Sequence, residues 1–242
     1  MNRHARHIAL AQVGDNGQAR IAQASVLLIG VGGIGCAAAS YLTSSGVGHI
    51  VLNDFDHVDE TNLGRQILFG PDDVGKPKAM VAAAKLATIN PEVRFSIIDE
   101  RLDAAGMAAA VADVDVVLDG CDNFATRFLV NDACVAARRC LVSGSAIRME
   151  GQLAVFGPDY DTSPCYRCLY EDADETLENC AGNGVLAPVP GVIGTLMGVE
   201  ALKFIAGIES PRGRLQLYDA GDGSFRPIDI AKRDDCPACG QP

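Results

Sequence analysis

The sequence predicts a doubly wound α/β fold with a mixed β-sheet. Three observations predict it: short apolar strands alternate with helical segments, a glycine-rich turn follows the first strand, and 48% of the 242 residues are hydrophobic. A chain of this length and composition can bury one large core. We therefore expect a single domain with an N-terminal arm (1–24), a core (25–157) and a C-terminal part (158–242).

The first βαβ unit is the clearest local pattern. It consists of a strand, a glycine turn, a helix of small residues closed by a glycine, and a second strand: Ser25–Ile29, Gly30, Ile34–Ser44, Gly46 and His49–Asn53. The acidic Asp54 follows the second strand directly. This order predicts a Rossmann-like nucleotide-binding core.

The alternation continues downstream. Helices are expected at Lys78–Ile89 and Ala125–Arg138, and strands at Val93–Ile98, Val114–Leu118, Cys140–Gly144 and Gln152–Phe156. From Asp159 to Pro190 the chain is rich in Cys, acidic residues, Gly and Pro and has no periodicity, which is typical of a functional loop. A helix over 192–206 and two strands, Arg214–Tyr218 and Phe225–Ile230, complete the prediction.

Charge and hydropathy exclude some partners. The formal net charge of −11 argues against a general affinity for nucleic acid or an anionic membrane, because both require a basic surface. The longest apolar stretch, Gly191–Gly207, contains Glu200 and Lys203 and is shorter than the ~20 residues of a bilayer span, so it predicts a core helix. The N-terminus does not resemble a signal peptide. We expect a cytoplasmic protein.

A phosphate-binding turn is predicted after the first strand. Gly30-Val31-Gly32-Gly33-Ile34-Gly35 fits G-x-G-x-x-G between a strand and a helix, where backbone amides can bind phosphate oxygens. Asp54 follows nineteen residues after Gly35, at a position where a carboxylate accepts hydrogen bonds from ribose hydroxyls. This pattern does not separate ATP from NAD. The alternative is that the glycines serve only tight packing of helix on strand.

Two cationic segments favour phosphate-transfer chemistry. Thr61–Gln66 contains Arg65, and Gly75–Lys78 ends at Lys78. Cations aimed at phosphates stabilise the charge of a phosphoryl transition state. In these and other segments, the chain resembles the MoeB/ThiF/HesA family of sulfur-carrier-protein adenylyltransferases, which is related to the ubiquitin-activating enzymes. The segments that carry the resemblance, in order along nearly the whole chain, are Asp54–Asp56, Asn62–Gln66, Gly75–Lys78, Leu118–Asn123 and Ser145–Gln152.

The resemblance implies a role for each matching residue. It places Gly33 at the phosphates of ATP, Asp54 on the ribose, and Asn62, Arg65 and Lys78 on the triphosphate. It places Asp122 near Mg2+, assisted by Asn123. It also implies a homodimer in which Arg6 reaches the ATP of the other subunit, although His4, His7 and Gly64 depart from the family pattern. The simpler alternatives are solvated charges for the three cations and a helix cap for Asp122.

The implied reaction is ATP-dependent adenylylation of a protein carboxylate. The C-terminal glycine of a ubiquitin-like sulfur-carrier protein, which ends in Gly-Gly, attacks the α-phosphorus and releases pyrophosphate. No general base is needed, because a carboxylate is ionised at neutral pH. Ile147–Gln152 resembles MoeB, of molybdopterin synthesis, and Gln66–Phe69 resembles ThiF, of thiamin synthesis. Both pathways stay open, with a preference for the first, and sulfur could come from a separate sulfurtransferase.

Four of the nine cysteines form two C-x-x-C pairs, Cys165/Cys168 and Cys236/Cys239. Two such pairs let four thiolates converge on one structural Zn2+ with bonds of about 2.3 Å. A redox C-x-x-C is the alternative. A zinc ion here would tie the irregular loop to the C-terminus.

Cys180 lies alone in a glycine-containing stretch, at the position where the family has a cysteine that can take the acyl group. The alternative is a bystander thiol. The remaining cysteines fall in predicted helices or strands and are expected in the core: Cys36, Cys121, Cys134 and Cys140.

Two other classes of protein share the glycine turn. An NAD(P)-dependent oxidoreductase would need a proton-transfer residue, and all four histidines precede residue 58. A non-catalytic scaffold would not need Arg65, Lys78 and Asp122 together. Both readings are less economical than an adenylyltransferase.

Overall fold

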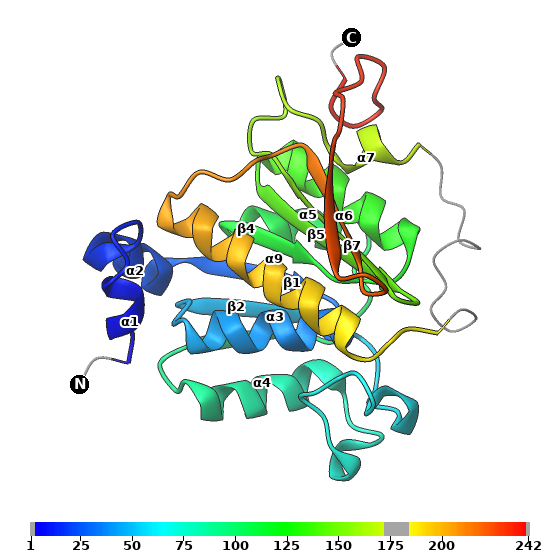
Figure 1. Ribbon diagram of the computed structural model, residues 1–242. Helices are drawn as coiled ribbons and strands as arrows, with labels where there is room; N and C mark the ends of the chain where they lie inside the picture. Colours follow the sequence, from blue (N-terminus) through cyan, green and yellow to red (C-terminus); the bar gives the residue numbers. More distant parts are fainter. Residues whose placement is uncertain (1–2, 172–183, 241–242) are drawn as a thin grey trace.

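The computed structural model describes residues 3–171 and 184–240, and within them one mixed eight-stranded sheet forms the centre of the fold (Figure 1). The strand order is β3-β2-β1-β4-β5-β6-β7-β8. The strands are β1 (Ser25–Ile29), β2 (His49–Asn53), β3 (Arg94–Ile98), β4 (Val116–Asp119), β5 (Cys140–Ile147), β6 (Glu150–Phe156), β7 (Arg214–Asp219) and β8 (Ser224–Asp229). The first five in this order are parallel, and β6 to β8 continue the sheet in antiparallel fashion. The predicted doubly wound α/β class with a mixed sheet is confirmed.

Helices cover both faces of the sheet and divide the core in two. The helices are α1 (Ala5–Ile8), α2 (Gly14–Gln23), α3 (Gly33–Ser44), α4 (Lys78–Ile89), α5 (Ala104–Ala112), α6 (Phe124–Ala137), α7 (Tyr166–Leu169) and α9 (Pro188–Ala206). In Figure 1, α3, α4 and α9 lie in front of the sheet, and α5 and α6 lie behind it. Each face has its own apolar cluster, built around Leu28 and Ile193 in front and around Leu27 and Phe128 behind. Alternate residues of β1 thus enter opposite clusters, as the pleat of a strand requires.

The segment predicted as an arm, 1–24, contains two helices in its described part. The ring of His7 lies 3.2 Å from the Gln18 side-chain oxygen, and the Gln18 amide donates to the Ser45 carbonyl at 2.9 Å. Ile21 of α2 is 1% exposed. These contacts dock the N-terminal helices beside the loop that enters β2, at the amino ends of the parallel strands. The polar composition of the segment concealed this docking.

Helix α9 is the predicted core helix. By length and composition it is the one helix of the described chain that could span a bilayer, yet half of its apolar window is buried inside the fold. It begins at Pro188, four residues before the predicted start, and packs along α3. A Cβ on Gly194 would lie 2.2 Å from the Ile34 carbonyl oxygen, so only glycine permits this approach of α9 to α3.

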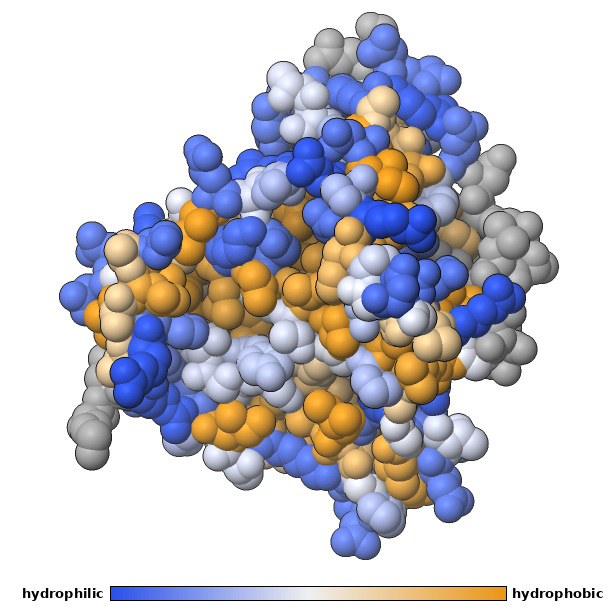
Figure 2. Space-filling view, viewed as in Figure 1, coloured by the Kyte–Doolittle hydropathy of each residue, from blue (hydrophilic) through white to orange (hydrophobic). Residues whose placement is uncertain are grey.

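Figure 2 shows the face that α3, α4 and α9 cover, where apolar side chains alternate with charged ones. Tyr41, Met80 and Val199 each expose about half of their surface there.

One helix on the opposite face, α5, was not predicted. Its run of alanines lacks an amphipathic pattern, and only Met107 and Val111 are buried.

Candidate active site and cysteine cluster

One cavity of about 280 Å³ lies at the carboxyl ends of the central parallel strands. It opens between β1 and β4, where the strand order reverses direction, which is where doubly wound sheets bind ligands. Its walls continue along β5 to β8. The chemically informative residues that line it are Gly30, Gly32, Gly33, Asp54, Arg65, Gln66, Lys78, Arg101, Cys121, Asp122, Asn123, Arg127, Ser145, Gln152, Tyr218 and Arg226.

The glycine turn leads from β1 into the N-terminus of α3, which faces the cavity. Gly30 has φ +83°, and a Cβ there would lie 3.1 Å from the Gly120 carbonyl oxygen. Gly32 and Gly33 line the cavity, while Gly35 is not among the lining residues. A Cβ on Gly35 would lie 2.0 Å from the Gly30 carbonyl oxygen, so Gly35 allows the helix to pack on the turn. The glycines thus divide between lining the cavity and close packing.

Asp54 connects β2 to the glycine turn. Its carboxylate accepts hydrogen bonds from the backbone amides of Val31 (2.7 Å) and Asp56 (2.9 Å). The side chain lines the cavity although the residue is only 9% exposed. Burial raises the pKa of this carboxyl, and the nearby Lys78 acts in the opposite direction. The carboxylate both fixes the turn and presents an acceptor to a ligand.

Two of the three predicted cations line the cavity wall beside Asp54. Lys78 begins α4, is 6% exposed, and places its Nζ 3.1 Å from the Asp56 carboxylate. Arg65 donates to the Thr61 carbonyl at 3.0 Å, which holds its side chain along the preceding turn. Asn62 lies in the same segment but is not among the lining residues. Lys78 and Arg65 thus supply positive charge to the cavity.

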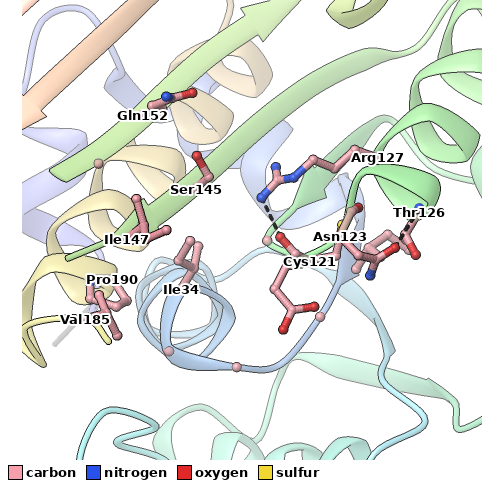
Figure 3. A pocket seen from close by; sticks show the side chains of 18 of the residues that line it. Ile34, Cys121, Asn123, Thr126, Arg127, Ser145, Ile147, Gln152, Val185 and Pro190 are labelled. Atoms are coloured by element: carbon pink, nitrogen blue, oxygen red, sulfur yellow. Dashed lines mark hydrogen bonds between the residues drawn. The ribbon is translucent and has the colours of Figure 1, made fainter. Parts of the chain in front are cut away.

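Asn123, rather than Asp122, caps helix α6. The Asn123 side-chain oxygen accepts a hydrogen bond from the Thr126 amide at 2.9 Å (Figure 3). The alternative prediction that Asp122 serves as the cap is therefore wrong. Asp122 is exposed to the cavity, and its carboxylate makes no hydrogen bond or ion pair within residues 3–171 and 184–240. It is available to a cation.

Gln66 lines the cavity next to Gly32, although the sequence patterns assigned it no role of its own. The residue is 4% exposed, and its side-chain oxygen has no hydrogen-bond partner among the described residues. The amide nitrogen would lie 3.7 Å from a Cβ on Gly32. A buried amide oxygen without a partner costs free energy, about 1–3 kcal/mol, that a hydrogen-bond donor on a bound ligand can offset. Gln66 therefore belongs with the residues that can bind a ligand, its oxygen accepting from a donor and its amide nitrogen donating to an acceptor.

Several other lining residues come from segments far away in the sequence. Ser145, Gln152, Leu217 and Arg226 stand opposite one another across β5 to β8, so their side chains point to one face of the sheet. At the other end of the cavity, the Arg101 guanidinium lies 4.4 Å from the centre of the Phe55 ring. Only strand pairing brings these residues together. The sequence singled out Ser145 and Gln152 only as the ends of a family segment, and it gave no signal for Leu217, Arg226 or Arg101.

Cys121 lines the cavity but is a poor nucleophile. Burial, followed by the nearby Asp119 carboxylate, raises the pKa of its thiol well above the ordinary value. The thiolate form is the nucleophile, so Cys121 stays neutral and unreactive near pH 7. The prediction that it is a core residue needs one correction, because it reaches the wall of the cavity.

Neither Arg6 nor any of the histidines lines the cavity. Arg6 is an exposed residue of α1, on the side where the parallel strands begin, whereas the cavity is where they end. All four histidines, His4, His7, His49 and His57, belong to the described residues, and none lines the cavity. The cavity thus lacks the histidine that would relay a proton in a dehydrogenase.

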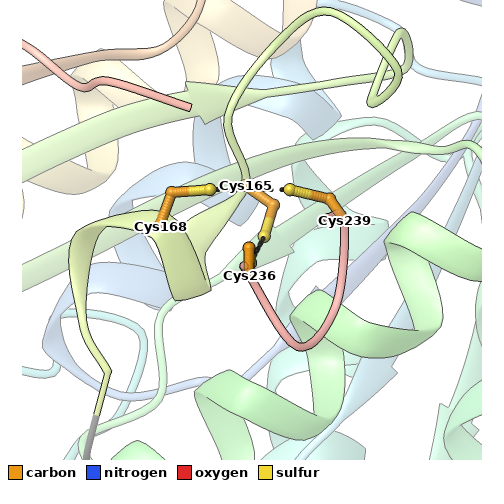
Figure 4. Close-up of side chains that lie close together, drawn as sticks. All are labelled: Cys165, Cys168, Cys236 and Cys239. Carbon is orange, nitrogen blue, oxygen red and sulfur yellow. Dashed lines mark hydrogen bonds between the residues drawn. The ribbon is translucent and has the colours of Figure 1, made fainter. Parts of the chain in front are cut away.

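The two C-x-x-C pairs converge, as predicted, at a second place in the fold (Figure 4). Cys165, Cys168, Cys236 and Cys239 are all buried, and their sulfur atoms lie within 4.8 Å of one another. Two of the sulfur pairs are 3.5 and 3.6 Å apart, far beyond a disulfide bond of about 2.05 Å. Four convergent thiols with this spacing fit a tetrahedral metal site with bonds of about 2.3 Å.

The polypeptide around the cluster holds it to α6. The Asn131 amide donates to the Cys165 sulfur at 3.7 Å, and its oxygen accepts from the Tyr166 amide at 2.8 Å. Arg167 forms a bidentate pair with Asp132 at 2.7 and 2.8 Å. Cys180, the predicted acyl acceptor, lies outside the described residues.

Comparison with known proteins agrees with this geometry. The model of the ThiF family matches residues 4–238. Molybdopterin-synthase adenylyltransferase of Escherichia coli (strain K12) is 44% identical, over 100% of this chain and 97% of that protein. Sulfur carrier protein ThiS adenylyltransferase of the same organism is 42% identical, over 98% of this chain and 94% of that protein. The crystal structure of E. coli MccB with ATP superposes with a TM-score of 0.86 at 26% identity, over 99% of this chain and 75% of that one. The predicted resemblance is thus confirmed, and the chain belongs to the ThiF family.

Proposed function

We propose that the chain is an ATP-dependent adenylyltransferase that activates the C-terminal glycine carboxylate of a ubiquitin-like sulfur-carrier protein. The observation that carries the proposal is the convergence of Asp54, Arg65, Lys78 and Asp122 on one cavity beside the glycine turn. Two relatives above 40% identity are named as adenylyltransferases of ThiS and of molybdopterin synthase. A related solved structure holds ATP.

Each group has a distinct task in this proposal. The amides at the start of α3 and the Gln66 amide nitrogen donate to phosphate oxygens, and Asp54 accepts hydrogen bonds from the ribose. Lys78 and Arg65 stabilise the negative charge that grows on the phosphates as pyrophosphate leaves. Asn62 would bind the triphosphate from the same turn as Arg65, whose backbone amide donates to the Asn62 carbonyl at 3.0 Å. Orientation of the carboxylate against the α-phosphorus supplies the rest of the acceleration.

Asp122 is the proposed ligand for Mg2+. Carboxylate oxygens are the ligands that Mg2+ prefers, and the Asp122 carboxylate faces the cavity without a partner in the described chain. The ion would neutralise phosphate charge when bound. Asn123 would fix the backbone beside Asp122 by capping α6.

The carrier's tail would enter from the antiparallel side of the sheet. The cavity continues there along Gln152, Tyr218 and Arg226, away from the glycine turn. The relatives' names span two pathways, molybdopterin and thiamin synthesis, and we favour the molybdopterin carrier. A separate sulfurtransferase would supply the sulfur.

Pyrophosphate exchange tests the proposal. The protein is incubated with ATP, labelled pyrophosphate and one purified carrier at a time, and formation of labelled ATP is followed. Exchange should require the carrier and should disappear when its terminal glycine is deleted. A failure of exchange with carriers of both pathways, together with tight binding of a nicotinamide dinucleotide, would instead support an oxidoreductase. Binding of a carrier without ATP turnover would support a scaffold.

Three further assignments complete the proposal. Arg6 would act in trans in a homodimer, since it lies far from the cavity of its own chain. The four-cysteine cluster would hold a structural Zn2+, in a cytoplasmic setting that keeps the thiols reduced. Cys180 would accept the acyl group after adenylylation. Cys180→Ala should then retain exchange and lose the covalent adduct with the carrier, which thiol-sensitive gel analysis detects.

A further inference from the structure

A buried ion pair lies directly beneath the loop that carries Asp122. Arg127, in the first turn of α6, is 2% exposed, and Asp119, the last residue of β4, is 1% exposed. The Arg127 Nη1 lies 3.4 Å from the Asp119 carboxylate. No sequence motif singled out this pair. A pair buried this deeply carries a desolvation cost, so the contacts it makes require an explanation.

The ion pair binds both the backbone amide and the backbone carbonyl of Cys121, the residue before Asp122. The Asp119 carboxylate accepts from the Cys121 amide at 3.1 Å. The Arg127 Nη2 donates to the Cys121 carbonyl at 2.5 Å (Figure 3). The Asn123 cap fixes the residue on the other side. Asp122 is therefore held between two immobilised neighbours, while its own side chain stays unbonded within the described residues.

The same pair is anchored to the sheet. Arg127 also donates to the Gly144 carbonyl at 3.2 Å and lies 3.3 Å from the Ser143 hydroxyl, both on β5. Ser143 in turn donates to Asp119 at 3.3 Å. On the opposite side, Gly120 and Cys121 pack against Gly30, where a Cβ would lie only 3.1 to 3.2 Å from their backbone atoms. The loop is thus fixed both to the sheet and to the glycine turn.

We infer that Asp119 and Arg127 are positioning residues that set the Asp122 carboxylate at the distance from the glycine turn that a metal-bound nucleotide requires. The inference rests on the proposed function, because it takes Asp122 as the ligand for a divalent cation. The geometry favours positioning over direct binding, since the Arg127 contacts with Asp119, Cys121 and Gly144 already use both guanidinium Nη atoms.

A double-mutant cycle tests the inference. Arg127→Lys keeps the positive charge, but its single amine cannot make the contacts that the two guanidinium Nη atoms make. The rate of pyrophosphate exchange should therefore fall about 100-fold. Asp122→Ala should cause a loss of the same order. If Arg127 acts through Asp122, the double variant should be no worse than Asp122→Ala alone. Losses that multiply would overturn the inference. Asp119→Asn, which keeps the side-chain shape, should show the same coupling to Asp122→Ala. It replaces Arg127→Lys in the cycle if that variant does not fold.

A binding measurement separates this inference from the proposed function. Mn2+, followed by electron paramagnetic resonance with ATP present, should bind more weakly to Arg127→Lys than to wild type. ATP affinity in EDTA, measured by calorimetry, should be unchanged. Arg20→Lys is the matched control, because Arg20 also donates to a backbone carbonyl, that of Ala206, away from the cavity. Unchanged Mn2+ binding in Arg127→Lys would reject the inference, whereas wild type that fails to exchange would reject the proposed function instead.

Discussion

Lys78 and Asp56 form an ion pair at the wall of the cavity, with 3.1 Å between the Lys78 Nζ and the Asp56 carboxylate. The lysine side chain is 8% exposed and that of the aspartate is 57% exposed. The buried partner therefore depends on the pair more than the exposed one does. A triphosphate in the cavity would compete with Asp56 for the ammonium group.

Removing the Lys78 charge should abolish most exchange. Lys78→Met keeps the length of the side chain, and we expect the exchange rate to fall about 100-fold, since one cationic contact to the transition state is lost. Lys76→Met is the control, because the Lys76 side chain is 57% exposed and its ion pair with Asp73 is long, at 3.9 Å. Equal activities of the two variants would remove Lys78 from the chemistry.

The pKa of Asp54 predicts a pH dependence of stability. Burial raises the pKa of this carboxyl above its ordinary value of 3.8, so the folded protein binds a proton more readily than the unfolded chain does. The stability contributed by Asp54 is then largest at low pH and is lost as pH rises from about 4 through the folded-state pKa. Urea unfolding of wild type minus Asp54→Asn should show this fall. A difference that rises over the same range would contradict the burial effect.

The contribution of Asn123 to stability, as a helix cap, can be separated from its contribution to activity. Asn123→Ala should cost about 1 kcal/mol of unfolding free energy, because it removes the acceptor for the Thr126 amide. Asp103→Ala is matched to it, since Asp103 caps α5 by accepting from the Gly106 amide at 2.8 Å. Both variants should lose similar stability, measured by chemical denaturation. Only Asn123→Ala should also lose exchange, and an equal loss in both would show that the effect is general destabilisation.

The local patterns of the sequence predicted the parts of the fold that follow from nearest neighbours. Ser25–Ile29 and His49–Asn53 coincide with β1 and β2, because a continuous apolar run between turn residues has few other stable forms. Helix α5 escaped prediction, because alanines mark neither face of a helix. The N-terminal helices escaped because their stability comes from docking, through Gln18 and Ile21, rather than from helix propensity.

The candidate site divides in the same way. Asp54, Arg65 and Lys78 lie in or beside recognisable motifs, and the cavity does bring them together. Arg127, on α6, and Arg226, on β8, could not be found, because other elements supply their neighbours at the cavity. Gly144 of β5 contacts Arg127, and Leu217 of β7 stands opposite Arg226. The choice between Asp122 and Asn123 as the cap also depended on backbone geometry, because either side chain can accept that hydrogen bond.

Disruption of the cysteine cluster should remove metal and stability together. Cys239→Ser replaces one thiolate of four, and we expect the bound zinc, measured by elemental analysis, to fall to background while the melting temperature drops. Cys134→Ala is the control, because Cys134 is a buried thiol outside the cluster. A wild-type protein that is fully folded but metal-free after purification without chelator would contradict the assignment.

The position of Arg6 makes the two-chain hypothesis testable by mixing. Arg6 and the cavity lie at opposite ends of the parallel strands, so within one chain Arg6 cannot complete the site. If it acts in trans, Arg6→Ala and Lys78→Met homodimers are each inactive, but a mixed dimer has one site with both residues intact. Random exchange of subunits makes half of the dimers mixed, so about one quarter of wild-type exchange activity should return. Arg3, whose side chain donates to the Ile89 carbonyl at 3.2 Å, is the control, and Arg3→Ala should not require such complementation. No recovery after verified subunit exchange would show that Arg6 and Lys78 do not serve one site from two chains.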